Sequence, residues 1–506
     1  ILAQAVSAQE ALTEIPRSAL SLACSGARIH FPLLATSRRL EPIARAMSCT
    51  EFINQALLRD LPTERRWSYL CFSCALLVAL GSHQFVGPVK TAVFMDVVGT
   101  DWEPVAKSSV LVVLVPLLIG YSVLVSLYKA PEKLVLAICA FYAAFYLLIV
   151  AGLISGHGHP PAWVAWLLYY TTETKGVIVM PMIWSVITDV TTPDLAKKAY
   201  PIMFFAVQIG GIAGSYLAIQ VNDVGGEAGL LLMQTASFVL IALLARIACR
   251  MATSGEGEGL VDAAPEDSQD GARQGATPTT AWSLVTDQLY KGCEGVWLLV
   301  SRPYVFGAFW VSYANLMPRT ILDYQNSVLG VNSFENRNDQ IAFFGKVNLI
   351  INCGTALLTL IGTRPIVEAL GVGQSLLVLP VGMFFCMLAL CFRYTLFMST
   401  ASLVVVCILA YGLNSPCKEM LYVRTSREIK YKAKSWSEMY GNQLMKLFGA
   451  QVNLWVNRES DLCSPHCFQT HTTLIVSSVW VALWFGVAAR LGAQHRELEK
   501  DDKYVK

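Results

Sequence analysis

The stretch from Pro416 to Asn453 has the sequence PCKEMLYVRTSREIKYKAKSWSEMYGNQLMKLFGAQVN. Its first part concentrates six basic residues between two apolar runs: Lys418, Arg424, Arg427, Lys430, Lys432 and Lys434. A further lysine, Lys446, lies inside the second apolar run. A lysine at the centre of a membrane helix costs at least roughly 2.5 kcal/mol, so it persists where it faces a watery cavity or an anionic ligand. The stretch therefore predicts an anion pathway through a membrane.

The composition of the whole chain is typical of a membrane protein. Of its 506 residues, 55% are hydrophobic and 15% are charged, whereas a soluble domain has about 25% charged residues. The formal net charge of +2 and the lack of a basic domain argue against nucleic acid as a partner. Fourteen cysteines are scattered, many of them inside apolar runs, where cysteine behaves as a small hydrophobic residue. No disulfide framework is predicted.

Apolar runs long enough to cross a bilayer follow one another along the chain. We predict an all-α integral membrane protein with about twelve transmembrane helices in two halves of six, as in transporters built from paired repeats. The first half, 67–250, contains predicted helices near 67–87, 105–128, 133–154, 163–187, 200–221 and 229–250. The second half, 303–492, contains predicted helices near 303–325, 341–362, 373–393, 397–415, 437–456 and 470–491.

Three polar segments lie outside these halves. Residues 1–66 form an N-terminal extension that is disordered or used for targeting. Within it, residues 1–46 are rich in Ala, Ser and Arg, as in a transit peptide, but equally as in a region upstream of a true start at Met47. Residues 251–302 are predicted to be a flexible linker, and residues 493–506 a C-terminal tail.

The basic residues of the predicted loops are distributed unevenly. Loops on the side of the two termini contain fifteen lysines and arginines, in 128–133, 188–199, 250–302, 363–372 and 416–436. The opposite loops contain Lys90, Arg337 and Arg458. Because cytoplasmic loops carry the excess of Lys and Arg, we expect both termini and the linker to be cytoplasmic.

Ionisable residues in the first half mark a candidate cavity. Lys90 follows Gly87-Pro88, which can break a helix, so it lies either in a loop or inside a long, kinked first helix. Glu173 and Lys175 are two residues apart on the fourth predicted helix and point to different faces. We expect Glu173 to pair with a cation on another helix or to take up protons, the alternative being a purely structural buried pair. The face expected to meet the cavity contains Tyr169, Glu173, Gly176, Met180 and Trp184.

The second half contains further charges at predicted membrane depth. Arg319 and Asp323 are spaced i, i+4 and are predicted to satisfy one another. Lys346 is expected to extend to the membrane interface. The eleventh predicted helix has the sharpest signal, a polar stripe that needs a cavity to face. The stripe consists of Met439, Asn442, Lys446, Gly449 and Asn453.

Several other classes of site are weakly supported. Gly210 and Gly214 form a small-xxx-small pair, which indicates close helix packing rather than phosphate binding. The chain has no G-x-x-x-x-G-K-[ST] loop, so a P-loop ATPase is disfavoured. Cys463-Ser464-Pro465-His466-Cys467 and His471 are ligand-type residues, but their spacing is looser than in a zinc knuckle. No metal, cofactor or catalytic residue is therefore predicted, and an enzyme is the least favoured class.

The charges at predicted membrane depth are mostly positive. They are Lys90, Lys175, Arg319, Lys346 and Lys446 against Glu173 and Asp323. A cavity with this balance attracts a multiply charged anion, and Lys and Arg are common partners of phosphate. Tyr169, Tyr170 and Trp184 are candidates for stacking on a planar base. The residues alone predict a transporter of an organic or phosphorylated anion.

Several segments resemble the ATP/ADP translocase family, the nucleotide transporters of plastids and of obligate intracellular bacteria. The segments Lys418 to Tyr422 and Ser426 to Lys434 are similar to the family signature K-E-M-x-Y-I-P … K-x-K-x-K, and Gly441 to Gly449 partly keeps its continuation. The resemblance spans roughly residues 60–492. Its other segments are Pro88 to Thr91, Tyr170 to Glu173, Trp184 to Asp189, Thr192 to Pro201 and Gln208 to Ser215.

This resemblance implies a major-facilitator-like fold that exchanges ATP for ADP, or related nucleotides, by alternating access. It implies nucleotide-binding roles for Lys90, for Glu173 and for a C-terminal lysine that is one of Lys430, Lys432, Lys434 and Lys446. The family's glutamate on the seventh helix has no counterpart in Asn315 to Arg319, and Leu447-Phe448-Gly449 replaces its Ser-Gly-Gly. These departures leave open another nucleotide range, proton-coupled uptake or loss of transport.

The leading prediction is a multi-pass nucleotide transporter, with ATP, ADP or related nucleotides as substrates and the lipid bilayer as its surroundings. The membrane is the plastid envelope, that of another organelle or the plasma membrane. The alternatives are a transporter of another phosphorylated or organic anion and a non-transporting scaffold or receptor. The predicted substrate-binding residues are Lys90, Tyr169, Glu173, Lys430, Lys432, Lys434, Asn442 and Lys446.

Overall fold

The computed structural model describes residues 63–128, 130–156, 159–191, 193–254, 296–423, 425–426, 429, 433–457, 469–500 and 505. Leu61–Lys506 forms one compact unit. Most of the predicted N-terminal extension, most of the linker, Lys430, Lys432 and the segment Cys463 to Cys467 lie outside the described residues.

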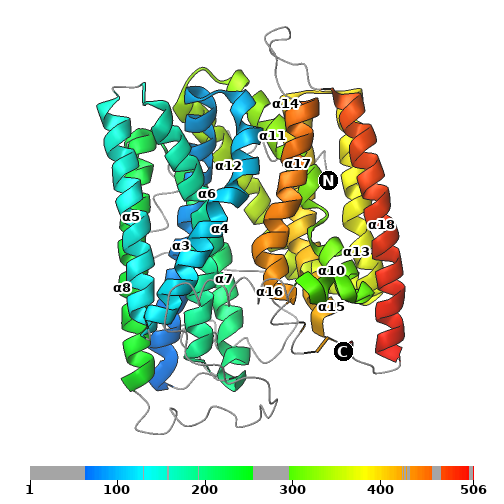
Figure 1. Ribbon diagram of the computed structural model, residues 1–506, viewed down its shortest axis with the longest axis horizontal. Coiled ribbons are helices and arrows are strands. Elements are labelled where there is room, and N and C mark those ends of the chain that lie inside the picture. Colours follow the sequence, from blue (N-terminus) through cyan, green and yellow to red (C-terminus); the bar gives the residue numbers. More distant parts are fainter. Residues whose placement is uncertain are drawn as a thin grey trace, which may run out of the picture. The chain divides into compact units, whose positions relative to one another are not determined.

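The first half consists of long helices joined by short connections (Figure 1). They are α3 (Thr63–Val97), α4 (Glu103–Leu127), α5 (Pro131–Ser155), α6 (Ala162–Asp189), α7 (Pro193–Ile219) and α8 (Gly226–Ser254), with the short 3-10 helix η4 (Thr100–Trp102) before α4. Proline begins α5 and follows the first residue of α4, where its missing N–H costs no helical hydrogen bond. Each predicted helix of this half overlaps one observed helix, although 105–128 and 200–221 run one and two residues past the ends of α4 and α7.

The second half is more interrupted. Its elements are α10 (Pro303–Tyr313), α11 (Leu316–Ser333), α12 (Arg337–Leu357), η5 (Leu358–Gly362), α13 (Thr363–Phe392), α14 (Leu396–Leu409), η6 (Ala410–Asn414), α15 (Ser415–Val423), α16 (Lys434–Trp436), η8 (Ser437–Gly441), α17 (Asn442–Val456) and α18 (Thr470–Lys500). Single π-helical turns at η5, η6 and η8 join neighbouring α-helices without a break. The predicted loop 363–372 is largely helical, and the chain turns at Gly371, whose φ of 76° favours glycine.

Eight stretches of the described residues are long and apolar enough to cross a membrane, and one of them, Arg337–Phe392, covers two predicted helices. Large apolar side chains such as Val112, Leu360 and Phe385 are exposed on these helices, as expected of a lipid-facing surface. The chain is thus an integral, multi-pass membrane protein. The predicted helices that fail this test are 163–187, 303–325 and 437–456, the ones with Glu173, Arg319 and Lys446. That these three helices also cross the membrane, and that there are twelve crossings in total, stays a prediction.

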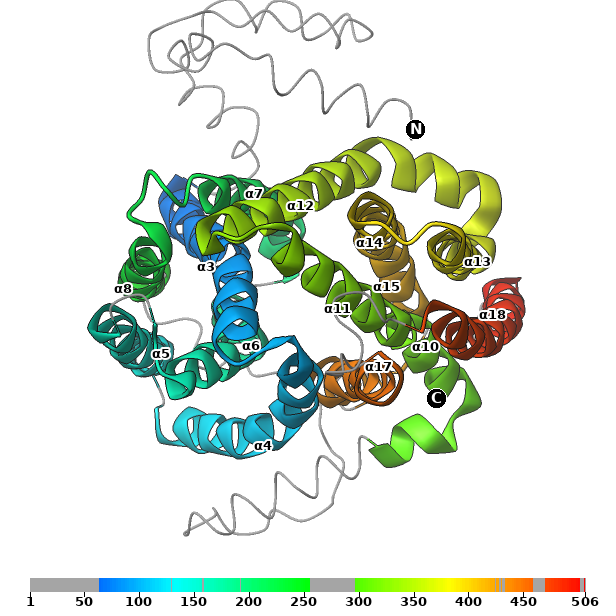
Figure 2. The same cartoon turned by 90° about the horizontal axis from the view of Figure 1, so that it is seen from above.

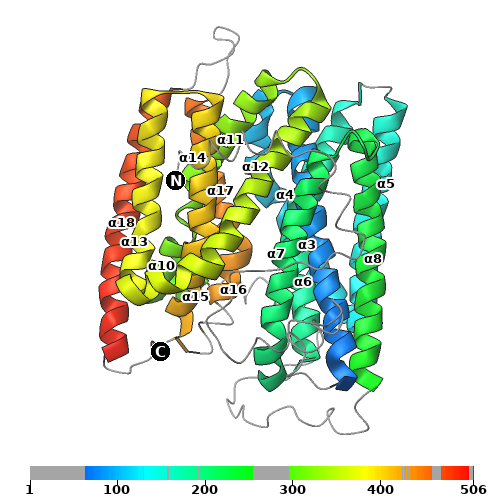
Figure 3. The same ribbon diagram turned by 180° about the vertical axis from the view of Figure 1, so that it is seen from behind.

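The two halves lie side by side when the helices are seen end-on (Figure 2). The helices α7 and α12 pack against each other across the boundary, and so do α4 and α17. Asn352 of α12 donates hydrogen bonds across it, to the Ser215 hydroxyl at 2.9 Å and the Gly211 carbonyl at 3.3 Å. Figure 3 shows α12 inclined against α7 from the opposite side.

Close packing inside the first half depends on small residues. A Cβ atom at Gly210 would collide with the carbonyl of Leu77, and one at Gly214 would collide with the carbonyl of Gly81. The small-xxx-small pair therefore lets α7 approach the backbone of α3 directly, as the sequence predicts.

Candidate substrate-binding site

An ion pair between α3 and α6 occupies the interior of the first half. The helix α3 continues through Pro88 to Val97, so Lys90 lies inside a helix and not in a loop. Lys90 Nζ donates to Glu173 Oε1 at 2.6 Å, and both side chains are largely buried. Lys90 is therefore the cation on another helix that Glu173 is predicted to need. Its place in the helix also removes Lys90 from the loop tally, which increases the charge asymmetry between the two sides.

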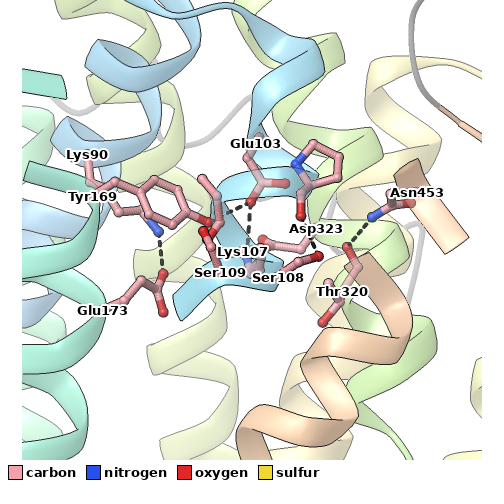
Figure 4. Close-up of polar contacts among 12 residues, drawn as sticks. Lys90, Glu103, Lys107, Ser108, Ser109, Tyr169, Glu173, Thr320, Asp323 and Asn453 are labelled. Carbon is pink, nitrogen blue, oxygen red and sulfur yellow. Dashed lines mark hydrogen bonds and ion pairs between the residues drawn. The ribbon is translucent and has the colours of Figure 1, made fainter. Parts of the chain in front are cut away.

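The ion pair continues into a chain of polar contacts (Figure 4). The Lys90 ammonium lies over the Tyr169 ring, 4.6 Å from its centroid, and the Tyr169 hydroxyl donates to Glu103 Oε1 at 3.1 Å. Lys107 donates to the same Glu103 oxygen at 3.3 Å and to Asp323 Oδ2 at 3.2 Å. We call Lys90, Glu103, Lys107, Tyr169, Glu173 and Asp323 the central cluster.

The central cluster connects the two halves. Lys107 and Glu103 are on α4 of the first half, whereas Asp323 is on α11 of the second half. A hydrogen bond from Gln451 of α17 to the Ser108 hydroxyl, at 2.9 Å, crosses the same boundary. An ion pair across the boundary must break when the halves separate, so Lys107–Asp323 can respond to rocking of the halves.

Lys446 on α17 is a cation of this region that has no partner among the residues that the structure describes. Among the described residues it forms no hydrogen bond or ion pair, although the charges of Glu173, Lys107, Arg319 and Lys90 act on it. Asn442 lies one turn earlier on α17, and its buried Oδ1 has no hydrogen-bond partner in the described part of the chain. The cations Lys90, Lys107, Arg319 and Lys446 thus face three carboxylates, those of Glu103, Glu173 and Asp323.

One predicted ion pair in the second half, between Arg319 and Asp323, is wrong. Arg319 donates to the Tyr411 hydroxyl at 2.8 Å and lies over the Tyr411 ring, while Asp323 pairs with Lys107. The i, i+4 spacing therefore does not produce an ion pair, because each side chain has a nearer partner on another helix. Lys346 is exposed on α12, and its extension to the membrane interface stays a prediction.

The polar stripe of α17 divides into two parts. Lys446 and Asn442 have polar atoms without partners in the described residues, whereas Asn453 donates to the Thr320 carbonyl at 3.2 Å. A Cβ atom at Gly449 would collide with α11 at Thr320. The later part of the stripe therefore packs against α11 and does not face a cavity, which corrects the prediction for Gly449 and Asn453.

The other predicted lysines lie elsewhere or outside the described residues. Lys434 donates to Glu419 Oε2 at 2.6 Å, and its ammonium lies 5.6 Å from the Tyr422 ring centroid. Its helix continues through η8 into α17, so Lys434 and Lys446 are roughly 18 Å apart along the axis. Lys430 and Lys432 lie outside the described residues. Among the predicted C-terminal lysines that are described, Lys446 is the one whose charge interacts with Lys90 and Glu173.

The aromatic side chains predicted to stack on a base are already packed. Tyr169 is 1% exposed, with Lys90 over its ring and Phe94 at 4.7 Å between centroids. Trp184 packs against Tyr200 and Phe204, so it does not share the surroundings of Tyr169. Tyr170, stacked on Trp166, is half-buried.

Sequence reasoning missed Glu103 and Lys107. Both lie at or next to the start of a very apolar run, where we expected only the beginning of a helix. The i, i+4 spacing of Glu103 and Lys107 is the sequence feature that could have indicated this ion pair. Only the tertiary structure, in which α4 lies against the second half, shows that Lys107 reaches Asp323 on α11.

Among the described residues, no three His, Cys, Asp or Glu side chains lie close enough together to hold a metal ion. The candidate Cys463 to Cys467 lies outside this part of the chain.

Comparison with known proteins identifies the fold. No family profile and no curated protein sequence matches the chain, so membership of the ATP/ADP translocase family stays a prediction. Solved structures do match: the nucleoside transporter NupG at a TM-score of 0.53 and 12% identity covers 84% of this chain and 99% of its own. A peptide transporter, POT, in complex with alafosfalin matches at a TM-score of 0.55 and 11% identity, and the match covers 83% of this chain and 94% of the transporter. A bacterial homolog of the human lysosomal transporter Spinster matches at a TM-score of 0.53 and 13% identity, and the match covers 85% of this chain and 97% of that protein. The chain therefore has the all-α fold of major-facilitator-type membrane transporters.

Proposed function

We propose that this protein is a nucleotide transporter that exchanges ATP for ADP by alternating access. The observation that carries this proposal is Lys446, a cation in the protein interior without a partner among the described residues. Lys446 is partly buried, and a charge without a partner inside a membrane protein is costly; a phosphorylated substrate supplies the missing negative charge. The sequence resemblance to the ATP/ADP translocases supports a nucleotide as that substrate.

In this proposal the substrate phosphates bind Lys446 and compete with Glu173 for Lys90. The Glu173 carboxylate lies 2.6 Å from Lys90, so a phosphate that binds this lysine has to compete with it. When phosphate binds Lys90, Glu173 loses its partner and becomes free to interact with another cation. Such an exchange of partners couples substrate binding to movement of the halves.

The seventh predicted helix also contributes a carboxylate. The resemblance implies a glutamate there, and Asn315 to Arg319 contains none. Asp323 lies on the same helix α11, one turn beyond Arg319, and contacts Lys107 of the first half. We propose that Asp323 serves as the acid of this helix and links substrate binding to the contact between the halves.

Counter-exchange in proteoliposomes tests the proposal. The purified protein is reconstituted with internal ADP, and uptake of labelled ATP is measured. Lys446→Ala is expected to reduce uptake roughly 10- to 150-fold, the value of a lost charge-assisted hydrogen bond, without reducing membrane insertion. Lys346→Ala is the matched control, since it removes an exposed lysine from another helix, α12. Wild-type uptake by Lys446→Ala would contradict the role of this residue.

The same assay separates the alternative substrates. Unlabelled sugar phosphates and organic anions are added as competitors of labelled ATP. If a sugar phosphate competes better than ADP, the protein transports a different phosphorylated anion. A scaffold or receptor predicts neither uptake nor stabilisation of the folded protein by nucleotides, whereas a nucleotide binder raises the unfolding temperature as ligand concentration rises.

A further inference from the structure

A second buried cation lies on the other face of α6. Lys175 follows Glu173 by two residues, which is a rotation of roughly 200° around the helix. Its side chain is buried, at 3% exposure, and Nζ donates to Gln234 Oε1 of α8 at 2.7 Å. The other polar contact of Nζ is the Ser82 carbonyl at 3.5 Å. Both partners are neutral, and among the described residues no carboxylate forms an ion pair with Lys175.

A cavity of about 110 Å³ lies next to this lysine, between α3, α6 and α8. His83 and Lys175 line it, together with mainly apolar side chains such as Val179, Met180 and Phe238. A cavity of this volume is large enough for a small ion with water, because one water needs only about 10–15 Å³ of such space. An apolar lining with one cation suits one compensating negative charge.

Two polar groups near Lys175 have buried atoms without a hydrogen-bond partner in the described part of the chain. Gln234, which holds Lys175 through Oε1, is fully buried, and its Nε2 has no partner there. The buried Nδ1 of His83, a residue that lines the cavity, has none there either. Unpaired buried polar atoms are costly. An anion in the cavity would accept a hydrogen bond from Lys175 and supply the negative charge that the neutral partners of this lysine do not.

We propose that this cavity binds a monovalent inorganic anion of the size of chloride. The anion would lie against Lys175 and neutralise it, so that α3, α6 and α8 pack around a balanced charge. A multiply charged anion is disfavoured, because a single lysine in a mainly apolar lining compensates one negative charge. The site is distinct from Lys446 and the central cluster, since Lys175 and Glu173 point to different faces of α6 and none of those residues lines the cavity.

Thermal unfolding of the purified protein tests this proposal. The unfolding temperature is measured in sodium chloride and in sodium gluconate at equal ionic strength, since the polyol carboxylate gluconate is poorly suited to the mainly apolar lining. Chloride well above its Kd is expected to raise the unfolding temperature in proportion to the logarithm of its concentration, by on the order of 5 °C. The chloride effect is expected to vanish in Lys175→Met and to persist in Lys346→Met, the matched control. It should also persist in Lys446→Gln.

Direct binding covers the case in which Lys175→Met fails to fold. Labelled chloride should bind the wild-type protein at one saturable site and be displaced by bromide. Equal unfolding temperatures in chloride and gluconate, or absence of saturable binding, would overturn the proposal. So would a chloride effect that disappears in Lys446→Gln but remains in Lys175→Met, because the anion would then lie at the proposed nucleotide site.

Discussion

The two faces of α6 treat buried charge in opposite ways. On one face, Glu173 is neutralised within the protein by Lys90, and the contacts continue through Tyr169 to Glu103. On the other face, Lys175 has only neutral partners and a cavity beside it. A charged residue in a membrane helix can thus be neutralised by another side chain, as Glu173 is, or have only neutral side chains beside it, as Lys175 has among the described residues. The helices packed on each face determine which of these occurs.

The largest expected effect separates paired from unpaired charges. Lys90→Ala leaves Glu173 buried without its partner, and breaking a buried ion pair costs about 3–5 kcal/mol. The double variant Lys90→Ala/Glu173→Gln removes the orphaned charge and is expected to recover most of this stability. Unfolding of the purified protein measures both changes.

Transport distinguishes this result from simple loss of folding. The double variant should be folded yet remain deficient in nucleotide exchange, since Lys90 is proposed to bind phosphate. If Lys90→Ala alone is as stable as the wild type, Glu173 is not neutralised by Lys90 in the way that the geometry indicates.

The next effect concerns the ion pairs at the end of the bundle where α3 ends. Arg337 at the start of α12 donates to Glu227 Oε1 at 2.6 Å and, through Nε, to Asp96 Oδ2 at 3.0 Å. Both acids belong to the first half, so Arg337 connects the halves. Arg337→Gln is expected to cost about 1–3 kcal/mol, because the arginine and Glu227 are partly buried. The loss should shrink as salt is added.

A charge pair within one helix is the control for Arg337. Arg364 and Glu368 form an exposed i, i+4 pair on α13. Glu368→Gln should leave unfolding, and its salt dependence, close to those of the wild type. Equal changes in the free energy of unfolding for Arg337→Gln and Glu368→Gln would show that the contact between the halves does not stabilise the protein more than an exposed ion pair does.

The smallest effect is expected at Asp323. Its side chain is 48% exposed, and Lys107 keeps Glu103 when Asp323 is changed. Asp323→Asn should therefore cost only about 0.2–1 kcal/mol of stability. Spin labels placed on α4 and α11 should nevertheless report a broader distance distribution between the halves. An unchanged distribution would contradict a role of Asp323 in holding the halves together.

The helical fold was accessible from the chain alone, because membrane helices are encoded by local composition. Runs such as 105–128 and 133–154 are apolar enough to identify by length and hydropathy, and no distant contact is needed to satisfy their backbone. The same reasoning predicted the close approach at Gly210 and Gly214, which depends on side-chain size. The helices α6, α11 and α17 are harder to identify as membrane-spanning from the sequence, because their charged residues lower the mean hydropathy.

The residue pattern is enough to predict a helical membrane protein with lysines and carboxylates at depth, in which Glu173 and Lys175 point apart. Which charges meet depends on how the helices pack in three dimensions. This packing paired Glu173 with Lys90, gave Asp323 to Lys107 instead of Arg319, and left Lys446 and Lys175 without carboxylates among the described residues. The physical reason is that ion pairs between helices depend on helix rotation and contact, which spacing along one helix does not specify.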